Sequence, residues 1–192
     1  MSGIETRPFA EFFHLVDGRS PDLPSTRRHL SQMKGMFADE DAWRLAMEKE
    51  DRLVFEFYEL SRPAHPGELL FGTSIVYPGR IGSEYHMTKG HFHTVLDTAE
   101  VYYCLSGEGR LLMENPEGDW DVQTLRPGAA VYVPPRYAHR SVNTGDRPLV
   151  TFFVFRADAG HDYGTIESKG FRKRIVERNG KVEVVDNENW RK

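Results

Sequence analysis

The segment Gly90-His91-Phe92-His93 is the part of this sequence that best explains the rest of it. Two histidines two residues apart project from the same face of an extended strand. Six residues separate His93 from Glu100, which begins an apolar stretch, and His139 comes later, after the rigid segment Val133-Pro134-Pro135. Three imidazoles and one carboxylate are a donor set suited to divalent iron, manganese, nickel, cobalt or zinc. From these residues alone two interpretations stay open: a metal site, or ordinary polar residues of a barrel that satisfy hydrogen bonds.

Short apolar stretches separated by turn signals surround this segment and predict an all-β fold. Strands are expected at 53–57, 69–77, 100–105, 110–114, 120–125, 130–133, 138–143 and 149–155. Their regular spacing favours a barrel or sandwich over parallel βαβ units. Further on, Asn179-Gly180 is a strong hairpin signal between residues 171–178 and 181–185.

Residues 1–38 carry turn-prone clusters such as Ser20-Pro21-Asp22 and are expected to be irregular. A helix is predicted near 41–50, because acidic residues precede it and Trp43, Ala46 and Met47 share one face. The chain is thus expected to form a single domain. It would have an N-terminal extension (1–50), a barrel core (51–160), and a C-terminal loop and hairpin (161–192).

Composition excludes several classes of protein. Of 192 residues, 39% are hydrophobic and 28% charged, and the net charge of -4 is spread along the chain. No basic stripe suggests nucleic-acid binding, and no apolar run approaches the ~20 residues of a membrane span. Met1 to Phe13 lacks the pattern of a secretory signal, and Cys104 has no cysteine partner. We therefore expect a cytoplasmic protein.

Two groups of residues resemble the motifs of the cupin superfamily. Gly90-His91-Phe92-His93, Glu100 and Gly107 resemble the first motif, and Gly128, Pro134, His139 and Asn143 resemble the second. The sequence departs from the pattern in its longer gap before Glu100 and in Arg136, which replaces a glycine. The resemblance implies a single cupin, a jelly-roll-like β-barrel. We expect it to carry an irregular N-terminal extension, one short helix and a C-terminal β-hairpin.

A closer resemblance is to the cupin-type phosphoglucose isomerases, found in archaea and some bacteria. The resemblance extends from about Arg27 to Asn187. Four segments carry it: Thr88–His93, Asp97–Tyr102, Val131–Pro135 with Ala138–Arg140, and Ala157–Ile166. The resemblance implies a homodimeric, cytoplasmic enzyme of glycolysis or gluconeogenesis that interconverts glucose 6-phosphate and fructose 6-phosphate.

The same resemblance implies roles for particular residues. One divalent metal ion per subunit would be bound, iron(II) (Fe2+) being the first choice and Mn2+, Ni2+, Co2+ or Zn2+ the others. Thr88 and Gly90 would hold the phosphate, and Tyr102 and Tyr163 would contact the sugar. His161 would move a proton during ring opening, unless it is an idle loop residue. The roles are therefore these: metal ligands His91, His93, Glu100 and His139; catalytic residues Glu100 and His161.

Several alternatives stay open at this point. Glu100 is either the base of an enediol route or only a ligand in a hydride route, and mannose 6-phosphate is a conceivable second substrate. Arg136 and Arg140 are taken as surface residues near the mouth of the site. Because cupins host many functions, an iron-dependent dioxygenase and a non-catalytic sugar-phosphate-binding cupin are the competing interpretations.

Overall fold

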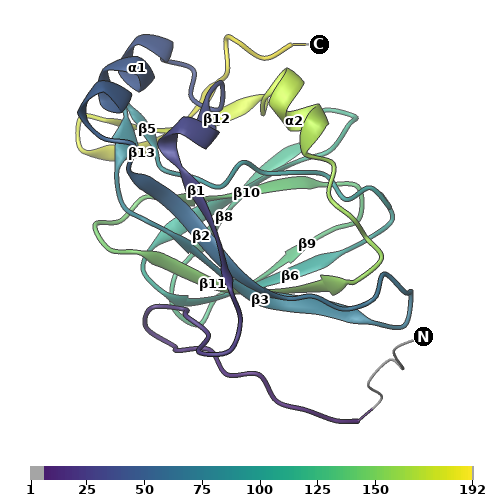
Figure 1. Cartoon of the computed structure of the whole chain (residues 1–192). Helices are drawn as coiled ribbons and strands as arrows, with labels where there is room; N and C mark the ends of the chain where they lie inside the picture. Colours follow the sequence, from purple (N-terminus) through teal and green to yellow (C-terminus); the bar gives the residue numbers. More distant parts are fainter. Residues whose placement is uncertain (1–6, 192) are drawn as a thin grey trace.

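Strands dominate the computed structural model, which describes residues 7–191 (Figure 1). The element order is β1 (Ser25–His29), a 3-10 turn (Leu30–Met33), α1 (Glu40–Lys49), β2 (Leu53–Leu60), β3 (Leu69–Val76), β4 (Arg80–Ile81), β5 (Glu84–Tyr85), β6 (Glu100–Ser106), β7 (Gly109–Glu114), β8 (Trp120–Leu125), β9 (Ala130–Val133), β10 (Ala138–Asn143), β11 (Leu149–Arg156), α2 (Tyr163–Lys169), β12 (Lys173–Arg178) and β13 (Lys181–Asp186).

Within residues 7–191, the strands pair antiparallel in three sheets. The largest has the order β1-β2-β3-β11-β6-β9, so that β11 lies between strands distant from it in sequence. A second sheet has the order β10-β7-β8, and a third the order β13-β12-β5-β4. These sheets confirm the all-β fold of the cupin type. They also confirm the strands expected from the apolar stretches and the hairpin at Asn179-Gly180.

The N-terminal extension is more ordered than its sequence indicates. The prediction that residues 1–38 are irregular is wrong for Ser25–His29, which pair with β2 as the edge strand β1. Residues 1–6 lie outside the described part. The five residues of β1 are polar, four of them are partly buried and Arg27 is exposed, so no alternation of apolar residues marks them. Backbone hydrogen bonds to β2, which composition does not disclose, hold the strand in place.

The helix count also differs, because α2 follows Asp162 in a segment expected to be a loop. Asp162 caps it by accepting a hydrogen bond from the Thr165 N–H (3.1 Å), and Gly170 ends it. Only Ile166 of this helix is buried, and seven residues are too few to show a periodic apolar face. The expected helix is confirmed as α1, whose Trp43 packs against the core.

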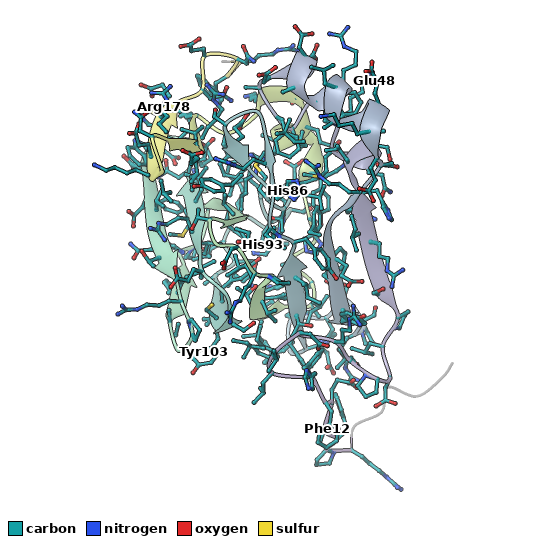
Figure 2. The ribbon with its side chains drawn as sticks, turned by 90° about the vertical axis from the view of Figure 1, so that its left-hand side faces the viewer. Phe12, Glu48, His86, His93, Tyr103 and Arg178 are labelled. Carbon is teal, nitrogen blue, oxygen red and sulfur yellow. The ribbon has the colours of Figure 1, made fainter. Side chains whose placement is uncertain are left out.

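Buried hydrophobic side chains from all three sheets form one large cluster. Figure 2 shows His86 and His93 among these interior side chains, whereas Phe12, Glu48, Tyr103 and Arg178 lie at the periphery. Among the described residues, no helix is both long and apolar enough to span a membrane.

Candidate active site

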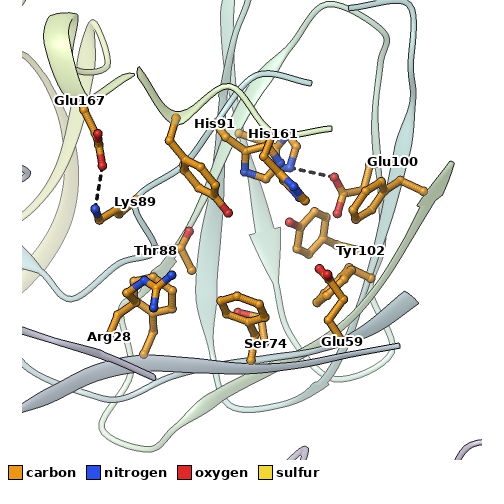
Figure 3. A pocket seen from close by; sticks show the side chains of 17 residues that line it. Arg28, Glu59, Ser74, Thr88, Lys89, His91, Glu100, Tyr102, His161 and Glu167 are labelled. Carbon is orange, nitrogen blue, oxygen red and sulfur yellow. Dashed lines mark hydrogen bonds and ion pairs between the residues drawn. The ribbon is translucent and has the colours of Figure 1, made fainter. Parts of the chain in front are cut away.

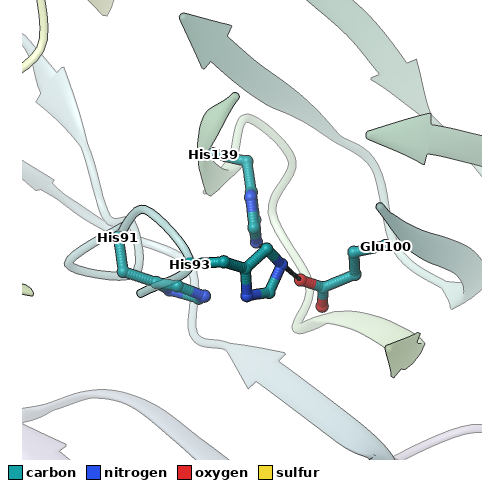
Figure 4. A group of neighbouring side chains, drawn as sticks. All are labelled: His91, His93, Glu100 and His139. Carbon is teal, nitrogen blue, oxygen red and sulfur yellow. Dashed lines mark ion pairs between the residues drawn. The ribbon is translucent and has the colours of Figure 1, made fainter. Parts of the chain in front are cut away.

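Four polar side chains meet in the interior, and they are the four expected metal ligands (Figure 4). His91, His93, Glu100 and His139 are between 2% and 9% exposed. One potential ligand atom from each lies within 4.8 Å of those of the others. The Glu100 carboxylate Oε2 is 2.9 Å from His139 Nε2 and 3.2 Å from His93 Nε2. The sequence therefore identified residues that the fold brings together from β6, β10 and the segment before β6.

The donor atoms of this cluster fit a divalent metal ion. The Nε2 atoms of His91, His93 and His139 and Oε2 of Glu100 are buried without a well-oriented hydrogen bond, even where their distances are short. Behind the rings, His93 Nδ1 faces the Gly160 carbonyl (3.3 Å) and His139 Nδ1 faces that of Tyr137 (3.4 Å). A carbonyl only accepts, so Nδ1 carries the proton and Nε2 keeps its lone pair for a metal. Buried, convergent and unsatisfied donors indicate a divalent metal site.

Backbone contacts fix the position of the first two histidines. The extended strand expected for 90–95 is reduced to isolated bridges, in which His91 pairs with His139 and Phe92 pairs with Asp162. Gly90 has φ 76°, and a Cβ there would lie 2.6 Å from the Phe171 ring and 2.9 Å from the His139 carbonyl oxygen. Glycine is therefore required at this approach of two backbones.

Arg140 is not the surface residue that the sequence suggested. It is 4% exposed, and its Nε donates a 3.1 Å hydrogen bond to the Lys89 carbonyl oxygen. The guanidinium lies 4.5 Å from the Phe171 ring centroid. Burial lowers the pKa of Arg140 to about 10, although Glu84 and Glu114 oppose that shift. Arg140 thus holds the backbone of the segment before His91 in place through the Lys89 carbonyl. Arg136 is exposed as expected, pairs with Glu117 and has a positive φ of 73°, in the region that favours glycine.

The electrostatics of the cluster keep its donors in the state that binds metal. Burial alone would raise the pKa of Glu100, but His139 and His93 outweigh it and lower the pKa to about 2. Burial lowers the pKa of His91 well below its usual value, and the neighbouring imidazoles add to this. At neutral pH the site therefore presents an ionised carboxylate beside a neutral imidazole, which is the form of each group that ligates metals.

A cavity of about 320 Å³ opens onto this cluster. Strands of the large sheet and β10 line it, and Figure 3 shows its polar residues in two groups. Arg28, Thr88 and Lys89 lie on one side, and Glu100 and Glu59 lie on the other. Its volume is in the range typical of small-molecule sites. One side of the cavity thus has Arg28 and the ion pair of Lys89 with Glu167, and the other side has two carboxylates.

All five of the remaining site residues predicted from the sequence line this cavity: Thr88, Gly90, Tyr102, His161 and Tyr163. His161 is not an exposed loop residue, since its ring packs 4.4 Å from that of His91 and stacks on Tyr163 at 5.6 Å. Burial lowers the pKa of His161 and raises that of Tyr163 to about 12. Burial and Glu100 raise the pKa of Tyr102 well above 10.

Sequence reasoning missed other residues of the cavity: Arg28, Glu59, Ser74 and Glu167. Arg28 lies in β1, where no strand was expected. Glu167 belongs to α2 and forms a 2.6 Å ion pair with Lys89. Glu59 could have been found, because it continues the alternation of Phe55 and Phe57 along β2, which places all three on one face.

The fold and the four-residue cluster together define a cupin with a candidate site for a divalent metal ion. Comparison with known proteins narrows this class. The family model for glucose-6-phosphate isomerase (GPI) matches residues 27–191. Glucose-6-phosphate isomerase of Thermococcus litoralis is 47% identical over 184 residues, which cover 96% of this chain and 97% of the relative. The glucose-6-phosphate isomerase of Pyrococcus furiosus is 52% identical over 165 residues, which cover 86% of this chain and 87% of the relative. The chain belongs to the glucose-6-phosphate isomerase family.

Solved structures give more distant similarities. A Bacillus subtilis oxalate decarboxylase with Mn(II) centres is 25% identical with a TM-score of 0.44, over 54% of this chain and 26% of that one. An oxalate oxidase is 13% identical with a TM-score of 0.49, over 59% of this chain and 56% of that one.

Proposed function

We propose that this protein is an isomerase that interconverts glucose 6-phosphate and fructose 6-phosphate. The observation that carries the proposal is the buried cluster of His91, His93, Glu100 and His139 at the end of a cavity with cations on one side. Membership of the family supplies the substrate, since the relatives bear that enzyme's name.

The reaction moves one hydrogen between C1 and C2 of the sugar while the carbonyl moves the other way. The four clustered residues would hold one divalent ion, which as a Lewis acid stabilises negative charge on the sugar oxygens. Carbon-bound hydrogen is acidic only beside a carbonyl, so a base near C2 completes an enediol route. Glu100 is the candidate base, although a carboxylate with lowered proton affinity is a poor base while it ligates metal. His161, in the same cavity, would move the proton of ring opening.

The cationic side of the cavity suits the phosphate group. Arg28 and Lys89 supply positive charge there, and Lys89 pairs with Glu167 at 2.6 Å, so a phosphate would compete with Glu167 for Lys89. The Thr88 hydroxyl oxygen already accepts a 3.1 Å hydrogen bond from the Ser141 N–H, so its own hydrogen is available to donate to a phosphate oxygen. Gly90 lets the chain approach closely beside it.

Thr88→Val should therefore weaken substrate binding without disturbing the metal. Losing one hydrogen bond to a charged group raises the Michaelis constant for fructose 6-phosphate roughly 10-fold. Steady-state kinetics measures this, with metal content determined on the same sample. The control is Thr124→Val, which makes the same change at an exposed position of β8. A Michaelis constant that is unaltered in Thr88→Val would refute the phosphate role.

We further propose that the resident ion is iron(II), and that the chain forms one domain and acts as a cytoplasmic homodimer. Charge and donor type suit iron(II) among the candidates. The outer face of β6 and β9 exposes Tyr103 (43%) and Tyr132 (59%), aromatic residues of the kind that protein interfaces favour. The single cysteine, Cys104, is buried and free, as is usual in a reducing compartment.

The function is tested by steady-state conversion of fructose 6-phosphate to glucose 6-phosphate, with and without a chelator. Turnover that disappears with chelation and returns with iron(II) is the expected result. Oxygen consumption with an organic substrate would instead identify a dioxygenase. Tight binding of the sugar phosphate without turnover would identify a binding protein, and either result overturns the proposal.

A further inference from the structure

The carboxylate side of the cavity contains a residue that the reaction described above does not use. Glu59 lies on β2, two residues beyond Phe57 and four beyond Phe55, and all three line the cavity. Figure 3 shows the Glu59 side chain directed into the cavity near Tyr102, on the side away from Arg28. Its carboxyl group therefore faces the space in which a substrate would lie.

In the row of the sheet that contains Glu59, the next two strands, β3 and β11, provide no polar partner for this carboxyl group. Glu59 pairs with Gly72 on β3, which pairs with Phe153 on β11, which in turn pairs with Tyr102 on β6. A Cβ at Gly72 would lie 3.0 Å from Phe153 Cζ and only 2.0 Å from the Tyr58 carbonyl oxygen, so a side chain is excluded there. Between Glu59 and Tyr102, the row thus contains only a glycine and an apolar ring.

The Glu59 carboxyl group also has no oppositely charged partner among the described residues. Among residues 7–191, no hydrogen bond or ion pair to it is found, and the charged group that acts on it is Glu100. Burial raises the pKa of Glu59, and repulsion from Glu100 adds to the shift. The carboxyl is also close enough to raise the pKa of Tyr102 and Tyr163. A half-buried carboxylate without a donor is unfavourable for the fold, so a ligand that brings donors is the natural partner.

We propose that Glu59 binds the hydroxyl groups of the sugar phosphate and so selects a neutral polyol chain at this side of the cavity. This inference rests on the proposed function for the class of substrate. An ionised carboxylate accepts up to four hydrogen bonds, and neighbouring hydroxyls of an open-chain sugar are donors that suit it. With the phosphate on the side of Arg28 and Lys89, the hydroxyls point towards Glu59. Glu59 repels a second anionic group at this side of the cavity, which disfavours bisphosphates.

Two substitutions at this position test the proposal on the metal-loaded enzyme. Glu59→Leu removes all hydrogen bonding at similar size, and Glu59→Gln removes only the charge. Calorimetric titration with sorbitol 6-phosphate, an open-chain polyol phosphate, should show roughly 10- to 100-fold weaker binding for Glu59→Leu, because hydrogen bonds to a charged group are lost. Glu59→Gln should change in the same direction by less. Binding of inorganic phosphate should be unchanged in both variants. Glu183→Gln, on the hairpin strand β13, is the control.

Thermal stability separates a binding role from a structural one. The raised pKa of Glu59 means that the fold disfavours its ionised form, so the stability it contributes is lost as the pH rises through the folded-state pKa. Glu59→Gln removes that charge and should raise the Tm at pH 7. A residue kept for structural contacts would instead lower the Tm when replaced.

Three results decide the matter. Unchanged affinity for sorbitol 6-phosphate in both variants overturns the proposal, as does an equal loss of affinity for inorganic phosphate. A wild-type enzyme without isomerase turnover overturns the proposed function. In that case, a selective loss of sorbitol 6-phosphate binding in Glu59→Leu would still support the assignment of Glu59 to the hydroxyl groups.

Discussion

His93→Ala is expected to lose its metal and, with it, all measurable isomerase turnover. The His93 ring supplies one of the four donors of the cluster, and the Gly160 carbonyl behind it fixes the ring so that Nε2 faces Glu100. Removal of an outer partner alone weakens metal binding 10- to 100-fold, and loss of the ligand itself should exceed that. Metal analysis after dialysis against a weak chelator measures the effect, and turnover of fructose 6-phosphate is measured on the same sample.

The matched control is His86→Ala, which removes another buried histidine. His86 is 1% exposed but lies outside the cluster, where Arg52 donates to it (3.3 Å). Its loss should lower the Tm through the void that it leaves, yet the protein should keep its metal. Stoichiometric metal at wild-type affinity in His93→Ala would show that the ligand assignment is wrong. Metal loss in both variants would attribute the effect to the fold.

The metal cluster could be predicted from the sequence because its four residues stand in two segments that resemble the cupin motifs, and each segment keeps its ligands. His91 and His93 are two residues apart, and Glu100 begins a strand that is visible as an apolar run. His139 follows a proline pair that ends β9. The long gap before Glu100 only lengthens a loop and removes no ligand, so the departure from the cupin pattern left the site intact.

The remainder of the cavity depends on contacts that sequence does not display. Arg28 reaches the cavity because β1 joins the sheet through backbone pairing, which polar residues form as readily as apolar ones. Arg140 is buried because the Lys89 carbonyl and the Phe171 ring, distant in sequence, surround it. A lone arginine is usually exposed, so its interior position follows only from the tertiary structure. The helix α2 was not predicted from the sequence, because seven residues are too few to show a periodic apolar face, although its N-cap residue, Asp162, is of a type that begins helices.

Glu100→Gln is the substitution that distinguishes a base from a mere ligand. Glutamine keeps the size of the side chain and an oxygen donor, so much of the metal should stay bound at saturating concentration. It lacks the group that can take a proton from carbon. If Glu100 is the base of the enediol route, turnover at full metal occupancy should fall by roughly 10²- to 10⁴-fold. Glu114→Gln is the control, because Glu114 is another buried carboxyl that pairs instead with Arg172, away from the cavity.

Reaction in deuterated water gives an independent reading of the same question. Proton abstraction by Glu100 predicts some deuterium in the product, because a carboxyl group exchanges its proton with solvent between steps. A well-shielded base can return its own proton, so missing label has meaning only beside the kinetics of the variant. Near-normal turnover in metal-replete Glu100→Gln, combined with unlabelled product from the wild type, would exclude Glu100 as the base. Direct hydride transfer between C1 and C2 would then be the better account, with Glu100 serving only as a ligand.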